Sequence, residues 1–187
     1  VFNHSLKRHV NDIPAAEDLV RELADDHDLV IVSFHGGAEG TAALHVPFAE
    51  EFYYGEARGD LVAFSHAVID AGADLVIGHG PHVPRGLEIY EDRLIAYSLG
   101  NFATYSGISV AGIKGVAPLL VVEVSPDGRF RQGEIVSLRQ VRPNGPRSDA
   151  NSRALTLMRE LSETDFGANA PIFTAEGIIF PNTPRAE

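Results

Sequence analysis

The stretch GHGPH, residues 78–82, places His79 and His82 three residues apart where glycine and proline oppose a helix. Neutral imidazoles are ligands for borderline metals such as Zn, Mn or Fe, and the ring of Pro81 restricts the loop, so less entropy is lost on binding. The pair therefore favours metal or phosphate chemistry. Four further histidines are expected to be ordinary solvated or capping residues, with the last of them inside a helix: His4, His9, His45 and His66.

A second candidate segment is HGGAEG, residues 35–40. Gly36 and Gly37 permit positive φ and let backbone N–H groups approach an anion, so they are candidate substrate-binding residues. His35 is a candidate metal ligand and catalytic residue. Glu39 could be a metal ligand, a general base or a solvated loop acid, and the sequence leaves these open.

Polar residues of the later loops are candidates for holding a substrate. Asn101 ends the run YSLGN, residues 97–101, and its amide could bind a substrate oxygen or form an Asx-type turn. Arg85 could bind a phosphate or carboxylate, or pair with Glu88. Neither Ser33 nor Ser98 lies in a nucleophile-elbow context, so serine catalysis is poorly supported.

The elements before these loops predict where the histidines meet. Residues 13–28 have the apolar spacing of a helix, and residues 28–34 form an apolar run typical of a strand covered on both faces. The pattern then repeats: residues 59–72 predict a helix and residues 74–77 a second buried strand. Strand, helix, strand predicts a parallel crossover. The two strand ends then share the sheet edge where α/β proteins gather ligands, so His35, His79 and His82 are expected to converge.

The rest of the chain predicts hairpins and one more helix. Residues 86–101 read as a hairpin turning at Glu91 and Asp92, and 118–141 as another with turn residues at 126–128. Residues 149–166 form a plausible helix capped by Asp149 or Asn151. The expectation is an α/β fold with mixed sheets and C-terminal hairpins, in one domain over residues 1–180 with a flexible tail at 181–187.

Composition limits the partners. The 187 residues are 44% hydrophobic, and 15 Lys and Arg against 26 Asp and Glu give a net charge of −11, which argues against nucleic acid. There is no cysteine, so a metal would have to use His, Asp, Glu or Asn, and no apolar run is long enough for a membrane span. The opening VFNHSLKRHVND reads like the middle of a domain, so we expect an N-terminal portion to precede it.

Three blocks carry a resemblance to a known family: VIVSFHGGAEG (30–40), IDAGADLVIGHGPHVPRGLEIY (69–90) and LIAYSLGNF (94–102). They resemble the carboxyl-terminal half of CapA-type capsule proteins, linked to poly-γ-glutamate synthesis and built on a metallophosphoesterase (calcineurin-like) fold. The resemblance implies a two-sheet α/β sandwich and a dinuclear centre of a divalent transition metal, Mn, Fe or Zn, with His35, His79 and His82 as ligands. It also implies a location at the cell envelope.

Two departures from the family pattern matter. The tryptophan and tyrosine expected around the first block are absent, and the family's amino-terminal motifs, which provide further ligands, are not in this chain. A two-metal hydrolase needs both ions about 3.5–4 Å apart. A separate N-terminal fragment of the same protein is therefore an expected partner, because its strands would complete the sheet.

The resulting hypothesis is a metal-dependent hydrolase acting on an anionic or peptide-like polymer. His35, Glu39 and Asn101 are its candidate catalytic residues, and Arg85, Asn101, Gly36 and Gly37 are its candidate substrate-binding residues. Two alternatives stay open: an epimerase-like acid–base enzyme using Glu39, and a non-catalytic binding module in capsule assembly.

Overall fold

The computed structural model describes residues 8–182, so His4 and residues 183–187 of the expected flexible tail lie outside it. The helices in this range are α1 (Ile13–Asp26), α2 (Leu61–Asp70) and α3 (Arg153–Phe166), with short 3-10 helices η1 (Gly112–Gly115) and η2 (Gly167–Asn169). The strands are β1 (Ile31–His35), β2 (Glu51–Tyr53), β3 (Glu56–Gly59), β4 (Leu75–His79), β5 (Leu87–Tyr90), β6 (Arg93–Ala96), β7 (Val116–Val124), β8 (Phe130–Val141), β9 (Gly145–Ser148), β10 (Ile172–Phe173) and β11 (Ile178–Phe180).

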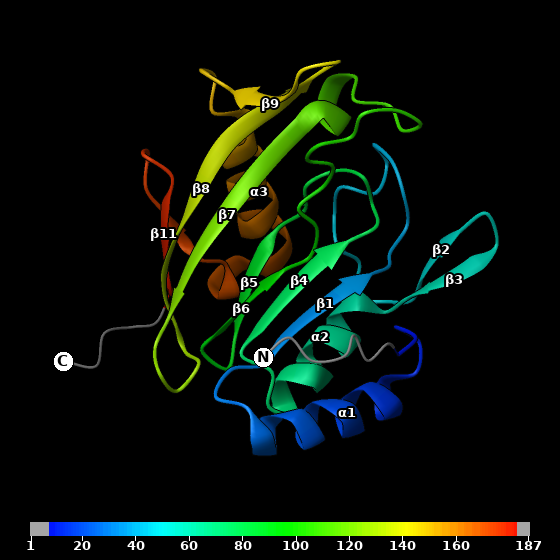
Figure 1. Cartoon of the computed structure of the whole chain (residues 1–187), viewed down its shortest axis with the longest axis vertical. Coiled ribbons are helices and arrows are strands. Elements are labelled where there is room, and N and C mark those ends of the chain that lie inside the picture. The colour runs from blue at the N-terminus through cyan, green and yellow to red at the C-terminus, as the bar shows by residue number, and fades with distance from the viewer. Residues whose placement is uncertain (1–7, 183–187) are drawn as a thin grey trace.

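A mixed sheet of order β1-β4-β6-β5 positions the histidines (Figure 1). β1 and β4 are parallel and joined through α2, as the strand–helix–strand pattern predicts, and His35 is the register partner of His79. β5 and β6 form the predicted antiparallel hairpin. Its turn residues Glu91 and Asp92 both adopt positive φ, as a tight two-residue turn requires.

The second sheet is antiparallel, of order β10-β11-β8-β7, with β9 paired to β8. Its main hairpin, β7–β8, is the one predicted over 118–141. The α/β class and the mixed sheet are therefore confirmed, whereas β9, β10, β11 and the hairpin β2–β3 were not predicted. β2–β3 turns at Tyr54 and Gly55, both at positive φ, and projects from the body of the molecule (Figure 1).

Helix termini follow local capping chemistry in two cases out of three. Asp12 caps α1 by accepting from Ala15 N, and Asp60 caps α2 by accepting from Ala63 N. The predicted caps of α3 are wrong. Ser152 holds the cap position without a side-chain bond, because Asp149 instead accepts from Arg153 Nε at 2.7 Å.

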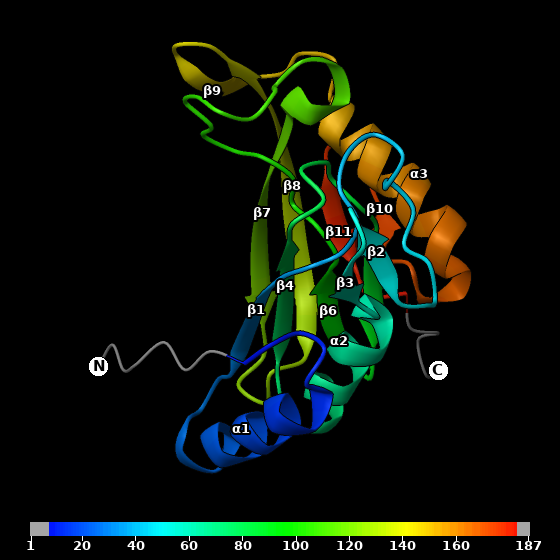
Figure 2. The same ribbon diagram turned by 90° about the vertical axis from the view of Figure 1, so that its right-hand side faces the viewer.

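Two apolar clusters flank the mixed sheet. One packs α1 and α2 against the sheet, for example Val20 and Val68 against Phe34 and Val76. The other joins the mixed sheet to the second sheet and α3 and contains, among others, Leu87, Ile135 and Met158. Figure 2 shows the mixed sheet between β7–β8 and α2.

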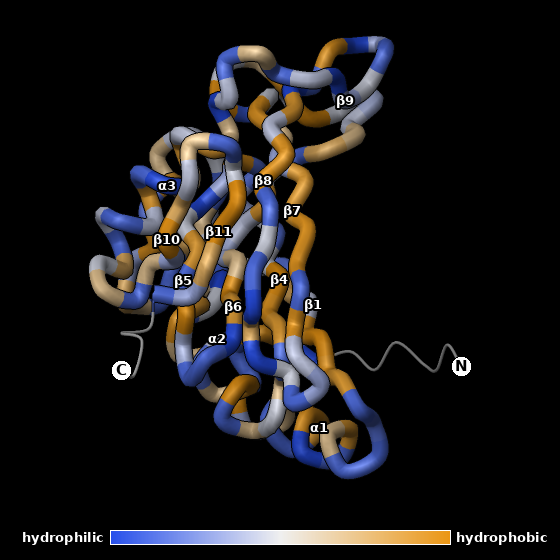
Figure 3. The backbone as a smooth tube through the Cα atoms, turned by 90° about the vertical axis from the view of Figure 1, so that its left-hand side faces the viewer, coloured by the Kyte–Doolittle hydropathy of each residue, from blue (hydrophilic) through white to orange (hydrophobic). Residues whose placement is uncertain are grey.

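β1 departs from the sequence prediction. It is mostly apolar (Figure 3), but Ile31 is 55% exposed and Ser33 is also exposed, so the expectation of a strand covered on both faces is wrong. The reason is its place at the edge of the sheet, where only the face carrying Phe34 is covered. Among residues 8–182, no strand pairs with the outer edge of β1.

Candidate functional site

The predicted convergence of three imidazoles is present in the structure. His35 and His79 lie side by side as register partners at the ends of β1 and β4, and the His35 and His82 ring centroids are 6.4 Å apart. Burial and the neighbouring His35 lower the pKa of His79, partly offset by a hydrogen bond to the Gly100 backbone. His79 is therefore held toward the neutral form, which is the form that binds metals.

His82 is held in an unusual conformation by Asn101. Its φ is +59°, in the left-handed region that side chains rarely adopt. Asn101 Nδ2 donates to the carbonyls of His82 (3.2 Å) and Lys114 (3.3 Å), so Asn101 Oδ1 faces His82 Nδ1 at 2.8 Å. Because an amide oxygen only accepts, His82 Nδ1 must donate, which leaves Nε2 as the free ring nitrogen. A second group that fixes the tautomer in this way is typical of a ligating histidine.

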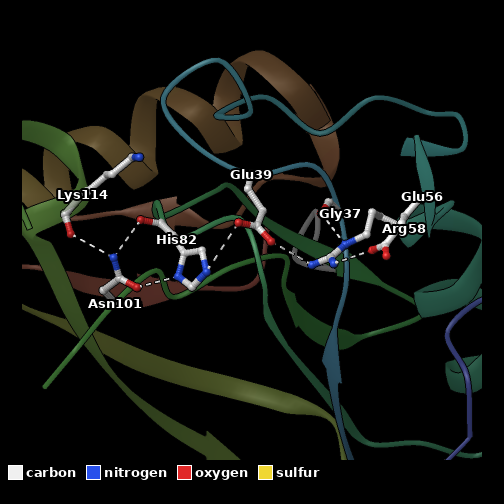
Figure 4. A network of polar contacts seen from close by, with 7 residues as sticks. All are labelled: Gly37, Glu39, Glu56, Arg58, His82, Asn101 and Lys114. Carbon is white, nitrogen blue, oxygen red and sulfur yellow. Dashed lines mark hydrogen bonds and ion pairs between the residues drawn. The ribbon is translucent and has the colours of Figure 1, made fainter. Parts of the chain in front are cut away.

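Glu39 lies between this ring and an arginine (Figure 4). Its Oε2 is 3.7 Å from His82 Nε2, and its Oε1 accepts from Arg58 NH2 at 3.1 Å. Arg58, on β3, also donates from Nε to Gly37 O at 3.3 Å and lies 3.7 Å from Glu56 Oε2. The unpredicted hairpin thus fixes the carboxylate that faces the imidazole.

Arg85 does not lie where a substrate could reach it. It is fully buried; NH1 and NH2 donate to the two oxygens of Glu51 at 2.8 and 2.7 Å, and Nε donates to Ala43 O at 2.7 Å. The substrate-binding expectation for Arg85 is therefore corrected: its guanidinium supports the surrounding loops. The alternative partner, Glu88, makes no ion pair with Arg85: the guanidinium pairs with Glu51, and Glu88 accepts from Tyr97 OH at 2.6 Å.

The glycines of the two loops serve close packing rather than anion binding. Gly36 N donates to His79 O at 2.9 Å and Gly37 N to Arg58 O at 2.8 Å, so both N–H groups are occupied and the substrate-binding expectation for them is not met. A β-carbon on Gly80 would lie 2.2 Å from Gly36 O. Only glycine allows the backbones of these two loops to approach so closely.

The remaining histidines have structural partners. His9 accepts from Asn11 N, and His66 lies within α2 as predicted and contacts Glu88 at 3.0 Å. His45 Nδ1 lies 2.7 Å from Asp165 and ties a loop to α3. These positions agree with their ordinary structural reading.

A family match accounts for the three sequence blocks. The sequence profile of a family described as "Bacterial capsule synthesis protein PGA_cap" matches residues 3–106, more than half of the chain. The chain belongs to this family. The match includes the three converging histidines, Glu39 and Asn101, and it confirms the CapA-type resemblance.

Curated relatives carry related names. A probable polyglutamine synthesis accessory protein of Mycobacterium tuberculosis is 38% identical over 97 residues, which are 50% of this chain and 22% of that protein. The capsule biosynthesis protein CapA of Bacillus anthracis is 36% identical over 80 residues, 43% of this chain and 16% of that protein. The PGA biosynthesis protein CapA of Bacillus subtilis is 33% identical over 89 residues, 48% of this chain and 20% of that protein. The chain thus matches about a fifth of the length of these relatives.

The side chains of the site are of the kinds that bind metals, but too few of them are grouped together to hold an ion by themselves. Within residues 8–182, no three His, Asp or Glu side chains are grouped so that they could hold one ion. His82 Nε2 and Glu39 Oε2 are nevertheless both acceptors when the ring is neutral, and 3.7 Å exceeds hydrogen-bond range. Metal bonds of about 2.1 Å from each would span such a gap.

Sequence reasoning missed Glu51 and Arg58. Both lie on the hairpin β2–β3, whose strands are only 3 and 4 residues long and so give little periodicity. The dipeptide Tyr54–Gly55 was the available turn signal.

No helix of the described range is both long and apolar enough to cross a membrane.

Proposed function

We propose that this chain supplies the histidine-rich part of a metal-dependent hydrolase in capsule or poly-γ-glutamate biosynthesis. The observation that carries the proposal is the pair His82 Nε2 and Glu39 Oε2, two acceptors 3.7 Å apart, with Nδ1 of the same ring already committed to Asn101. With the ring neutral, these are two lone-pair donors at a distance that a metal ion bound to both would suit. The names of the curated relatives support the capsule context.

Each side chain has a task in this proposal. Asn101 fixes the ring of His82 and its tautomer, Arg58 orients Glu39, and the lowered pKa of His79 keeps that imidazole available as a donor. A divalent metal, when bound, would supply Lewis-acid activation of a phosphoryl or acyl oxygen. The same arrangement of strands supports a sandwich of the metallophosphoesterase type.

A further segment of protein is needed to complete the donor set. The outer edge of β1 offers a place for it, because this edge carries no strand among residues 8–182 and the strand ends at His35. An unpaired edge strand is a ready template for another strand. We propose that a fragment carrying the remaining ligands pairs there, so that the strand ends of both parts meet at His35.

Elemental analysis of metal per chain tests the proposal. Protein without a histidine tag is incubated with Mn, Fe or Zn, and weak binding of about one equivalent is expected, because His82 and Glu39 are present whereas the ligands of the further segment are not. The double variant His79→Ala, His82→Ala should lose it. His27→Ala is the matched control, because His27 is exposed at the end of α1 and bonds only Leu23 O. Retention of metal by the double variant, or equal loss in the control, would refute the site.

A second candidate, a non-catalytic binding module, is favoured by one specific observation. The aromatic side chains of Phe52 and Tyr54 on the β2–β3 hairpin are 57% and 92% exposed, and Tyr105, in the loop after Asn101, is 77% exposed. Exposed aromatic residues of this kind are typical of interaction surfaces. Capsule-assembly activity that survives His79→Ala but not Tyr54→Ala would favour this candidate over the hydrolase.

A further inference from the structure

Lys114 is attached to the histidine site through its backbone. It lies in η1, between the loop that follows Asn101 and strand β7. Its carbonyl accepts from Asn101 Nδ2 at 3.3 Å and from Gln140 Nε2 at 3.4 Å. The amide that fixes the His82 ring therefore also fixes the position of Lys114 (Figure 4).

The side chain of Lys114 reaches the same loop as Glu39. Its ammonium nitrogen lies 3.9 Å from the point that a β-carbon would occupy on Gly40, the residue after Glu39. The lysine comes from one side of the site, whereas Arg58 approaches from the other. The loop of residues 35–40 thus has a cation on each side.

The two cations differ in what they bind. Arg58 is bound to Glu39 and lies 3.7 Å from Glu56, so its charge is balanced. Within residues 8–182, the Lys114 ammonium makes no hydrogen bond or ion pair, although the chain has 26 acidic residues against 15 basic ones. Lys114 is also half-buried as a residue. A half-buried cation without a carboxylate partner is suited to a charged ligand.

Neighbouring groups determine the sign and class of that ligand. The N–H groups of Gly36 and Gly37 are occupied and Arg85 is buried, so none of these can receive an anion. The Lys114 ammonium is a flexible point charge with three donors and suits a single oxyanion better than a planar, two-point contact. Its ammonium lies near Gly40, the residue after Glu39, so an anion held there would lie next to the loop that carries part of the proposed reactive centre.

We infer that Lys114 binds a carboxylate or phosphate oxyanion of the substrate beside the 35–40 loop of the histidine site. The inference rests on the proposed function for treating the histidine site as the reactive centre. It assigns the role of substrate anchor, expected from the sequence for Arg85, to a residue beyond the 3–106 family match. Lys114 is a binding residue in this assignment and takes no part in bond making.

Binding titrations in metal-free buffer with a chelator test this inference separately from the metal site. The two probes are inorganic phosphate and a short γ-linked glutamate oligomer, followed by calorimetry at low salt. The variants are Lys114→Gln and Lys114→Arg. Lys114→Gln should weaken at least one probe about tenfold, as expected for loss of one charged hydrogen-bond donor, while Lys114→Arg should retain most of the affinity. Which probe responds distinguishes phosphate from carboxylate.

Arg131→Gln is the charge-matched control. Arg131 is exposed at the start of β8. The turn before it contacts Asp74 and Asp92, which precede β4 and β6, so Arg131 lies toward the end of the mixed sheet opposite the histidines. It should bind the probes as the unmodified chain does, and both glutamine variants should keep the same melting temperature.

Three outcomes would overturn the inference: unchanged affinity in Lys114→Gln, an equal loss in Arg131→Gln, or no binding of either probe by the unmodified chain. Metal content is measured on the same variants. If the chain binds no metal but still binds anions through Lys114, the proposed hydrolase is refuted and this inference is not. If the chain binds metal but its anion binding does not depend on Lys114, only this inference is refuted.

Discussion

The buried pair Arg85–Glu51 offers a direct test of how the site is held. Glu51→Gln keeps the size of the side chain but removes its charge, leaving a guanidinium that is fully buried. In the native chain this guanidinium makes two bonds to Glu51, at 2.8 and 2.7 Å, and the same carboxylate accepts from Ala38 N at 2.9 Å. Breaking a buried pair by neutralising one partner costs about 3–5 kcal/mol.

Urea unfolding followed by circular dichroism measures this cost. With a slope of about 2 kcal/mol per molar urea, the midpoint should fall by roughly 1.5–2.5 M. Such a loss is a large fraction of the roughly 5–15 kcal/mol that stabilises a domain. Glu56→Gln is the control on the same hairpin: Glu56 is 76% exposed and 3.7 Å from Arg58, so its removal should cost less than about 0.5 kcal/mol.

The double variant Arg85→Met, Glu51→Leu separates charge burial from packing. Because it removes both charges together, it should recover much of the stability lost in Glu51→Gln. The reasoning would be refuted if Glu51→Gln cost no more than Glu56→Gln, since a fully desolvated guanidinium cannot lose its counter-charge at no cost.

Two further predictions concern a glycine contact and an acid-sensitive pair. Gly80→Ala should be strongly destabilised, because φ is +130° and the new β-carbon would lie 2.2 Å from Gly36 O. The control Gly107→Ala, with φ +85° and nothing within 4 Å of the new β-carbon, should lose only about 1 kcal/mol of stability. Equal melting temperatures for the two variants would contradict this prediction. The hydrogen bond from Arg153 holds the pKa of Asp149 below the usual pKa of an aspartate. The pair therefore stabilises the fold above that usual pKa, and the contribution is lost as pH falls through the lower folded pKa. Asp149→Asn should flatten the acid limb of the stability profile, and an unchanged acid slope would show that the pair contributes nothing.

Local signals were enough to predict the convergence of the histidines. The apolar runs before His35 and His79 predicted strands, and a helix between them predicted that the strands are parallel. The rule that parallel strands end at one edge then brought the histidines together without any knowledge of side-chain contacts. The connecting helix was expected over residues 59–72, and α2 lies within those bounds, between the cap Asp60 and Gly72 at φ +116°.

Contacts between residues distant in sequence could not be predicted in this way. Arg85 and Glu51 are 34 residues apart, and nothing local distinguishes this partner from Glu88, which is three residues away. The exposure of β1 was missed because an apolar run does not reveal whether a strand is central or at an edge. Gly36 and Gly37 were expected to bind an anion because the sequence does not show that their N–H groups donate to the carbonyls of His79 and Arg58.

The hydrogen-bond capacity of Asn101 limits what a substrate can do at this site. Both Nδ2 hydrogens are donated to the carbonyls of His82 and Lys114, and Oδ1 accepts from His82 Nδ1, which leaves one lone pair on Oδ1. Asn101 can therefore accept a proton donor from a substrate but cannot stabilise an oxyanion. The same three bonds hold His82 at φ +59°, so the amide positions the imidazole first. An anionic group must be held by another residue, and Lys114 is the cation at this site whose charge has no partner within residues 8–182.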